Sequence, residues 1–162
     1  MDYAKYKTAG RRFAAALVDG IAFLLFDVLL YKMLGDRLNV ASIAVISGIA
    51  RITYSVSMHA YHGQTLGKMI TGVYVANVSE QAGITLKQAL LRDGVWIALF
   101  LLQLPFLLNP YLFREYYTGA ILQVLESAVW IWLILELLTM YTNRKRRSVH
   151  DFIARTVVIK VT

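Results

Sequence analysis

Four apolar runs divide the chain, and polar or charged residues bound each of them. The runs cover about residues 12–33, 40–60, 94–108 and 118–141. A helix of about 20 apolar residues spans a hydrocarbon core of roughly 30 Å. The pattern therefore predicts an all-α polytopic membrane protein with four transmembrane helices, forming a single domain over residues 1–162. The third run is short and ends near Pro105, so three crossings are the alternative.

The positions of the 17 Lys and Arg residues favour four crossings. With four crossings, the N-terminus, the loop 61–92 and the tail 142–162 share one side and hold thirteen of these cations, against three on the other side. Arg51 lies inside the second run. Because cytoplasmic segments are enriched in Lys and Arg, both termini are expected to be cytoplasmic. Three crossings would place the six cations of the tail outside.

The cytoplasmic segments show local structure of their own. Ile70–Val78 and Thr156–Thr162 are rich in β-branched and aromatic residues, which predicts two strands that pair as a small cytoplasmic β element. Thr85 is placed to cap a short amphipathic helix over residues 86–93, lying on the membrane surface, and Ser148 to cap a second one over 149–155. The small residues of the second apolar run predict close packing with another helix.

Composition narrows the classes of function. Hydrophobic residues make up 58% of the chain and its mean hydropathy is +0.55, so the net charge of +7 does not indicate a nucleic-acid partner. The chain has no Cys, no nucleophile elbow and no His-Glu zinc motif, so we expect no enzyme, no cofactor and no metal. We interpret His59, His62 and His150 as interfacial residues, and Arg144–Arg147 as a contact for anionic lipids of the bilayer.

Charged residues at membrane depth are the candidate functional residues. Arg12 and Asp19 lie on one helical stripe about 10 Å apart, too far to pair. We expect Arg12 to reach Asp151 bidentately, and Lys68 to be one candidate partner for Asp19. A second set lies deeper and comprises Asp27, Arg51, Glu126 and Glu136. One arginine cannot neutralise three acids, so the surplus carboxylates are protonated, hydrated or used to bind a cation.

Three segments carry a resemblance to a known family. Arg11–Asp19 (RRFAAALVD), Gly63–Asp93 (containing GQTLGKMITGVYV and ITLKQALLRD) and Ser148–Ile159 (SVHDFIARTVVI) resemble the signature blocks of the RDD family of small bacterial and archaeal membrane proteins. The family is named for one arginine and two aspartates, which resemble Arg12, Asp19 and Asp151 here. The resemblance implies a multi-pass protein of a prokaryotic cell membrane. The remaining motif residues on the cytoplasmic side are Gly63, Thr65, Gly67, Lys68, Arg92 and His150.

Two functions remain open. The first is transport of a small ion or solute, with proton or cation coupling as one form of it, through the membrane-embedded charges and by a homo-oligomer. The second is a non-catalytic accessory or regulatory subunit that binds another membrane protein. Structural pairing of Arg12, Asp19 and Asp151 is the alternative to a direct role in transport. A phosphate-binding loop at GQTLGK is disfavoured, because the Gly-Lys-Ser/Thr arrangement is missing and the glycines suit tight turns and close packing.

Overall fold

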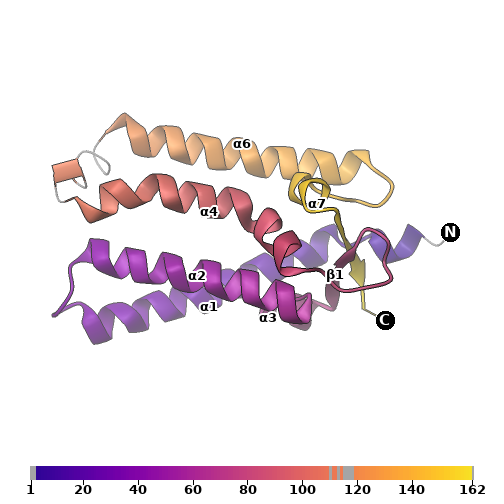
Figure 1. The fold of residues 1–162 in the computed structure, drawn as a ribbon, viewed down its shortest axis with the longest axis horizontal. Coiled ribbons are helices and arrows are strands. Elements are labelled where there is room, and N and C mark those ends of the chain that lie inside the picture. Colours follow the sequence, from indigo (N-terminus) through magenta and orange to yellow (C-terminus); the bar gives the residue numbers. More distant parts are fainter. Residues whose placement is uncertain (1–2, 110, 113, 115–118, 162) are drawn as a thin grey trace.

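The computed structural model describes residues 3–109, 111–112, 114 and 119–161. Four long helices run side by side along the length of the molecule (Figure 1). In chain order the elements are η1 (Tyr3–Tyr6), α1 (Ala9–Leu34), α2 (Val40–His62), α3 (Leu66–Thr71), β1 (Val73–Asn77), α4 (Leu86–Leu108), α6 (Ala120–Thr142), α7 (Val149–Ile153) and β2 (Thr156–Lys160).

Helices α1, α2, α4 and α6 are each long and apolar enough to cross a membrane. The predicted all-α polytopic fold with a small β element is therefore confirmed. The predicted spans 12–33, 40–60 and 118–141 lie within two or three residues of α1, α2 and α6 at each end. The aromatic residues of the connection 109–117 predict a belt at the membrane interface, but most of that connection, with residue 118, lies outside the described residues.

The third membrane helix differs from the prediction. A short surface helix over 86–93 and a separate span over 94–108 were expected, whereas α4 is one helix of 23 residues. Thr85 caps it with a full capping box, in which Thr85 Oγ1 accepts from the Gln88 backbone N–H at 3.2 Å and Gln88 Oε1 accepts from the Thr85 N–H at 3.0 Å. Gly94 costs a helix only about 1 kcal/mol, so it does not break α4. Because α4 begins at Leu86, eight residues before the third apolar run at residue 94, it is long enough to cross the membrane, and the shortness of that run no longer favours three crossings.

The two predicted strands form a sheet at one end of the bundle. β1 and β2 pair antiparallel, with Val75 opposite Val158. This sheet end also holds η1, α3, α7 and both chain termini, while the α1–α2 connection, the end of α4 and the start of α6 lie at the opposite, loop end (Figure 1). Gly63 and Gly72 terminate α2 and α3 with φ of 66° and 64°, values that glycine adopts without strain.

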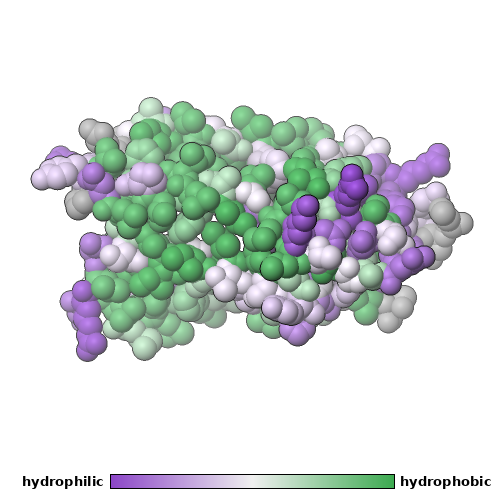
Figure 2. All heavy atoms as spheres, viewed as in Figure 1, coloured by the Kyte–Doolittle hydropathy of each residue, from purple (hydrophilic) through white to green (hydrophobic). Residues whose placement is uncertain are grey.

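The buried hydrophobic core lies at the sheet end. It joins α2, both strands and the first turns of α4 through Val56, Val73, Val75, Ile84, Ala89 and Val158. The four long helices instead expose many large apolar side chains, and Figure 2 shows hydrophobic residues along the bundle with hydrophilic ones gathered at its ends. A soluble protein would not expose so large an apolar surface, whereas a bilayer would cover it. The chain is an integral membrane protein.

Glycines permit the closest approaches between helices. At Gly48 of α2, an added Cβ would overlap the Phe100 ring of α4, so α4 is the neighbour that the small residues of α2 accommodate. At Gly67 of α3, an added Cβ would overlap the Ala15 carbonyl oxygen and approach the Asp19 carboxylate of α1. These contacts place α3 directly against the sheet end of α1.

Candidate functional site

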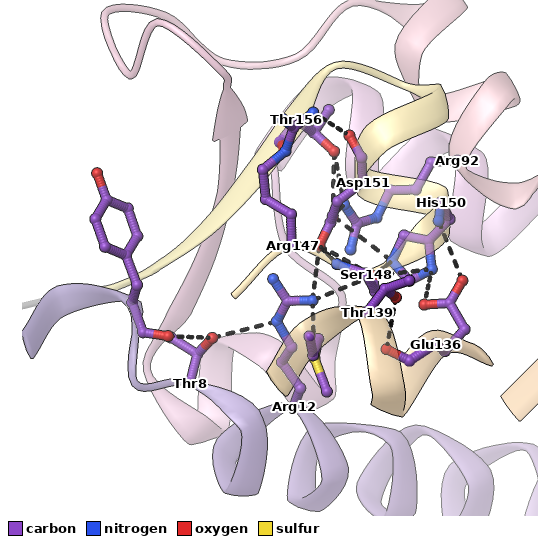
Figure 3. Close-up of polar contacts among 12 residues, drawn as sticks. Thr8, Arg12, Arg92, Glu136, Thr139, Arg147, Ser148, His150, Asp151 and Thr156 are labelled. Carbon is purple, nitrogen blue, oxygen red and sulfur yellow. Dashed lines mark hydrogen bonds and ion pairs between the residues drawn. The ribbon is translucent and has the colours of Figure 1, made fainter. Parts of the chain in front are cut away.

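Asp151 is the centre of a buried ion cluster at the sheet end (Figure 3). Its side chain is 0% exposed, and Arg12 Nη1 of α1 lies 2.7 Å from its Oδ2. The guanidinium of Arg92, from α4, contacts the other carboxylate oxygen. Thr156 Oγ1 donates to Oδ1 at 3.2 Å, while the Ser148 N–H and Oγ–H donate to Oδ2 at 3.1 and 3.0 Å. One carboxylate thus joins α1, α4, α7 and β2.

This cluster keeps Asp151 ionised. Burial raises the pKa of the carboxyl group, but the positive charges of Arg92 and Arg12 outweigh it and hold that pKa well below its usual range. The predicted pairing of Arg12 with Asp151 is present, but it is not bidentate. Arg12 uses Nη1 alone because Arg92 occupies the second oxygen, and Arg12 Nη2 is buried without a hydrogen-bond partner among the described residues.

His150 extends the cluster to α6. Its Nδ1 lies 2.7 Å from Glu136 Oε2, and its backbone N–H donates to Glu136 Oε1 at 3.1 Å. Burial, together with the nearby charge of Arg92, lowers the pKa of the His150 imidazole. The neutral imidazole can donate a hydrogen bond to the carboxylate, so this contact docks the end of α6 against α7 without a full ion pair.

Asp19 has no cationic partner among the described residues. The Thr65 hydroxyl donates to Asp19 Oδ2 at 2.6 Å, and the Tyr54 hydroxyl and the Gly67 N–H donate to Oδ1 at 3.1 and 2.8 Å. Two of these donors come from the start of α3. The expectation that Lys68 would be the partner is wrong, because the hydroxyl and backbone donors already occupy both carboxylate oxygens.

Lys68 contacts an imidazole instead. Its Nζ is hydrogen-bonded to His59 Nε2, and His59 Nδ1 lies 3.5 Å from Asp93 Oδ2 and 3.3 Å from Ser55 Oγ. Burial, reinforced by the charge of Arg92, lowers the pKa of Lys68 to about 7. An amine with such a pKa exchanges protons near neutral pH.

The deeper charges do not form one group. Asp27 is ion-paired with Arg51 and accepts a hydrogen bond from Ser47, roughly half-way along the bundle. Glu136 lies at the sheet end with His150. Glu126 is exposed on α6, and it lines neither of the two cavities within the bundle. Hydropathy locates a carboxylate along a helix but does not tell which way it faces.

Two cavities lie within the bundle and meet at its middle. The sheet-side cavity has a volume of about 490 Å³, and the charged residues on its wall are Arg12, Asp19, Arg51, Lys68, Arg92 and Asp93, with His59 and His150 beside them. The loop-side cavity, of about 820 Å³, is lined by Asp27, Ser47, Phe100 and Gln103 among others. Arg51, Ile52 and Trp96 line both cavities. The Asp27–Arg51 pair therefore lies where the two meet.

Comparison with known families gives one match, to the RDD family, over residues 6–155. This match covers nearly the whole chain. The chain belongs to the RDD family. Neither the curated proteins nor the solved structures gave a match.

In this RDD protein, the arginine and the two aspartates that are expected to match the residues of the family's name lie at two neighbouring sites. Arg12 and Asp151 form the buried ion cluster, while Asp19 is held by α3 and lines the sheet-side cavity with Arg12. Among the motif residues that are expected on the cytoplasmic side, Gly63 and Thr65 cap α2 and α3. The described residues contain no group of three His, Cys, Asp or Glu side chains arranged to hold a metal ion.

Sequence reasoning missed several members of the site. Tyr54 and Asp93 were not singled out, and Arg92 was not expected as a second partner of Asp151. A lone tyrosine in an apolar run carries no signal, because most such residues are packing or interface residues. Arg92 did carry a signal, since a cation within a membrane helix needs a partner. That signal was hidden in the sequence, because only the continuity of α4 shows that Arg92 lies within a membrane helix.

Proposed function

We propose that this RDD protein transports a small ion or solute across the membrane, through the two cavities that meet at Arg51. The observation that carries the proposal is the pair of cavities that share Arg51, Ile52 and Trp96. Polar side chains line both, although buried polar groups in a membrane are costly unless they serve a pathway or a structural pair. The Asp27–Arg51 ion pair is the barrier between the cavities in this conformation.

The same residues suggest how access alternates. The side chains of Arg51 and Asp27 are 43% and 33% exposed, and both line the loop-side cavity, from which we infer that water reaches the pair. A partly hydrated ion pair exchanges partners at lower cost than a dry one. Movement of the Arg51 guanidinium toward Asp19, or a small tilt of α2 against α4, would join the cavities.

We further propose the prokaryotic cell membrane as the location, with the sheet end in the cytoplasm. The distribution of Lys and Arg supports this orientation, because thirteen of the 17 lie on the segments at the sheet end. In that orientation Arg144–Arg147 face the inner leaflet, whose anionic headgroups attract such segments. The exposed apolar faces of the helices are compatible with a homo-oligomer.

Flux through proteoliposomes that contain only this protein tests the transport proposal. Sodium, potassium, proton, chloride and short-chain carboxylate gradients should be supplied in turn, with Asp27→Asn and Arg51→Gln variants beside the unaltered protein. We expect flux of one of these species, changed at least tenfold by either substitution. Glu126→Gln is the matched control, because Glu126 is exposed and lines neither cavity, and its flux should be unchanged.

Absence of flux from folded protein with every gradient would refute transport. Equal flux in the Arg51→Gln and Glu126→Gln variants would refute the pathway through Arg51. In the first case, co-purification of a second membrane protein in mild detergent would support the accessory-subunit alternative.

A further inference from the structure

We propose that the sheet-side cavity binds a small organic acid, with the carboxylate held by Lys68 and Arg12 and the apolar body held against Phe23, Ile52 and Trp96. This inference rests on the transport proposal for its biological role, and it names the class of solute. Binding itself can be measured without flux, so the two can fail separately.

The first support is a pair of cations with unused capacity to bind an anion: Lys68 has no carboxylate partner among the described residues, and Arg12 is paired with Asp151 through Nη1 alone. Lys68 Nζ has an imidazole nitrogen as its partner, and no carboxylate among the described residues lies within ion-pair distance of it. Arg12 Nη2 is buried and has no hydrogen-bond partner among the described residues, and the whole Arg12 side chain is only 10% exposed. Buried guanidinium donors are normally satisfied, and a carboxylate accepts from both kinds of cation.

The second support is that Asp19, the acid on the α1 wall of the cavity, is already engaged, since it accepts three hydrogen bonds. Asp93 keeps one free oxygen, because its Oδ2 lies 3.5 Å from His59 Nδ1 and has no hydrogen-bond partner among the described residues. A cation entering the cavity would find that single free carboxylate oxygen. An anion would find two cationic groups, Lys68 Nζ without a carboxylate partner and Arg12 Nη2 without a hydrogen-bond partner among the described residues, so these contacts favour an anion.

The third support is the wall of the cavity. Phe23, Ile52 and Trp96 contribute apolar surface beside the cations, and a volume of about 490 Å³ is within the range typical of small-molecule sites. Inorganic anions would leave this surface bare. A short carboxylic acid uses both parts of the wall, because its hydrocarbon chain is buried where its charge is paired.

Proton uptake accompanies binding. Charged or titratable groups face Lys68 from every neighbouring element: Arg12 and Asp19 from α1, His59 from α2, Arg92 and Asp93 from α4, and His150 and Asp151 from α7. Burial, reinforced by the charge of Arg92, lowers the pKa of Lys68 to about 7. A bound carboxylate favours the ammonium form, so the anion enters with a proton, which the lone pair of Lys68 Nζ takes up.

Calorimetry with butyrate and butylammonium, which have the same hydrocarbon chain and opposite charge, tests the inference on the full chain in detergent. We expect butyrate to bind and butylammonium not to bind. Two buffers of different ionisation enthalpy should report an uptake of about half a proton per butyrate at about pH 7, as follows from a pKa of about 7. Chloride and phosphate, titrated in parallel, should bind at least tenfold more weakly than butyrate.

Three variants locate the site. Lys68→Gln should weaken butyrate binding at least tenfold, which is the range for a lost hydrogen bond to a charged group. Lys68→Arg should keep binding but abolish proton uptake, because arginine is always charged. Lys87→Gln removes an exposed lysine outside the cavity and should change neither quantity.

Each contrary outcome identifies what is wrong. Binding of butylammonium, or of chloride as tightly as butyrate, would overturn the assignment of an organic acid. Butyrate binding that survives in folded Lys68→Gln would overturn the site. Flux of another ion without butyrate binding would support transport and refute this inference. Butyrate binding without any flux would support the binding site and refute transport.

Discussion

Neutralising Asp151 is the most informative perturbation of the ion cluster. In Asp151→Asn the side chain keeps its shape, but Arg12 and Arg92 remain buried, with 10% and 4% of their side chains exposed. Removing one partner from a buried ion pair costs about 3–5 kcal/mol, because the other charge stays desolvated. The unfolding equilibrium should therefore shift by roughly a hundred- to a few-thousand-fold.

The assay is reversible unfolding by SDS in mixed micelles, followed by tryptophan fluorescence. Lys87→Gln is the control, since removing an exposed charge at the sheet end, outside the ion cluster, should alter stability by less than about 0.5 kcal/mol. A second variant, Arg92→Met, and its combination with Asp151→Asn complete a double-mutant cycle. The combined variant should be less destabilised than the sum of the two by at least about 1 kcal/mol, because it removes one of the stranded charges.

Two results would refute this reasoning. The first is an Asp151→Asn protein that loses less than about 1 kcal/mol, a value typical of a surface pair. The second is simple additivity with Arg92→Met. Exchange of the two charges, Arg12→Asp with Asp151→Arg, is not expected to rescue folding, because the new guanidinium would face Arg92.

Three further predictions concern packing, acid stability and orientation. Gly67→Ala should destabilise the protein by about 1–3 kcal/mol in the same unfolding assay, since the new methyl group overlaps the Ala15 carbonyl oxygen. Gly94→Ala is the control and should be neutral or stabilising, because Gly94 has open space around it. Equal effects of the two substitutions would contradict the α1–α3 contact. Burial opposes ionisation of Glu80, but hydrogen bonds from Lys145, Lys5 and Tyr6 outweigh it and lower its pKa to about 2. The stabilisation from ionised Glu80 is thus complete above about pH 4.5 and is lost as the pH falls toward about 2. The difference in unfolding free energy between the unaltered protein and Glu80→Gln should therefore disappear over that range. A difference that stays constant with pH would contradict this prediction. Because the chain lacks Cys, the single substitutions Lys7→Cys, Asp36→Cys and Arg144→Cys can each be labelled in intact cells with an impermeant maleimide. Only Asp36→Cys should react, since it lies at the loop end. Labelling of Lys7→Cys would reverse the proposed orientation.

The sequence alone predicts the elements of this protein better than their partners. Helix spans follow from apolar length, and the strands and the caps at Thr85 and Ser148 follow from short-range chemistry, which local residues decide. The pairing of Arg12 with Asp151 also follows, because both were expected at the same membrane boundary.

The rest depends on how the helices are rotated and docked. Arg92 reaches Asp151 only because α4 is continuous and presents that residue toward α7, and Asp19 is satisfied by α3 only because Gly67 lets the two helices touch. Apolar length fixes neither rotation nor depth to within a turn. For the same reason Glu126 and Asp27, which look alike in the sequence, have different surroundings.

The position of Asp151 in the chain sets an order of biogenesis. The ribosome makes Arg12 and Arg92 before it makes the carboxylate that they share. The ion cluster can therefore close only after α7 has been synthesised and has docked. Until then, the two guanidinium groups that the folded protein buries around Asp151 lack the partner that joins α1 to α4.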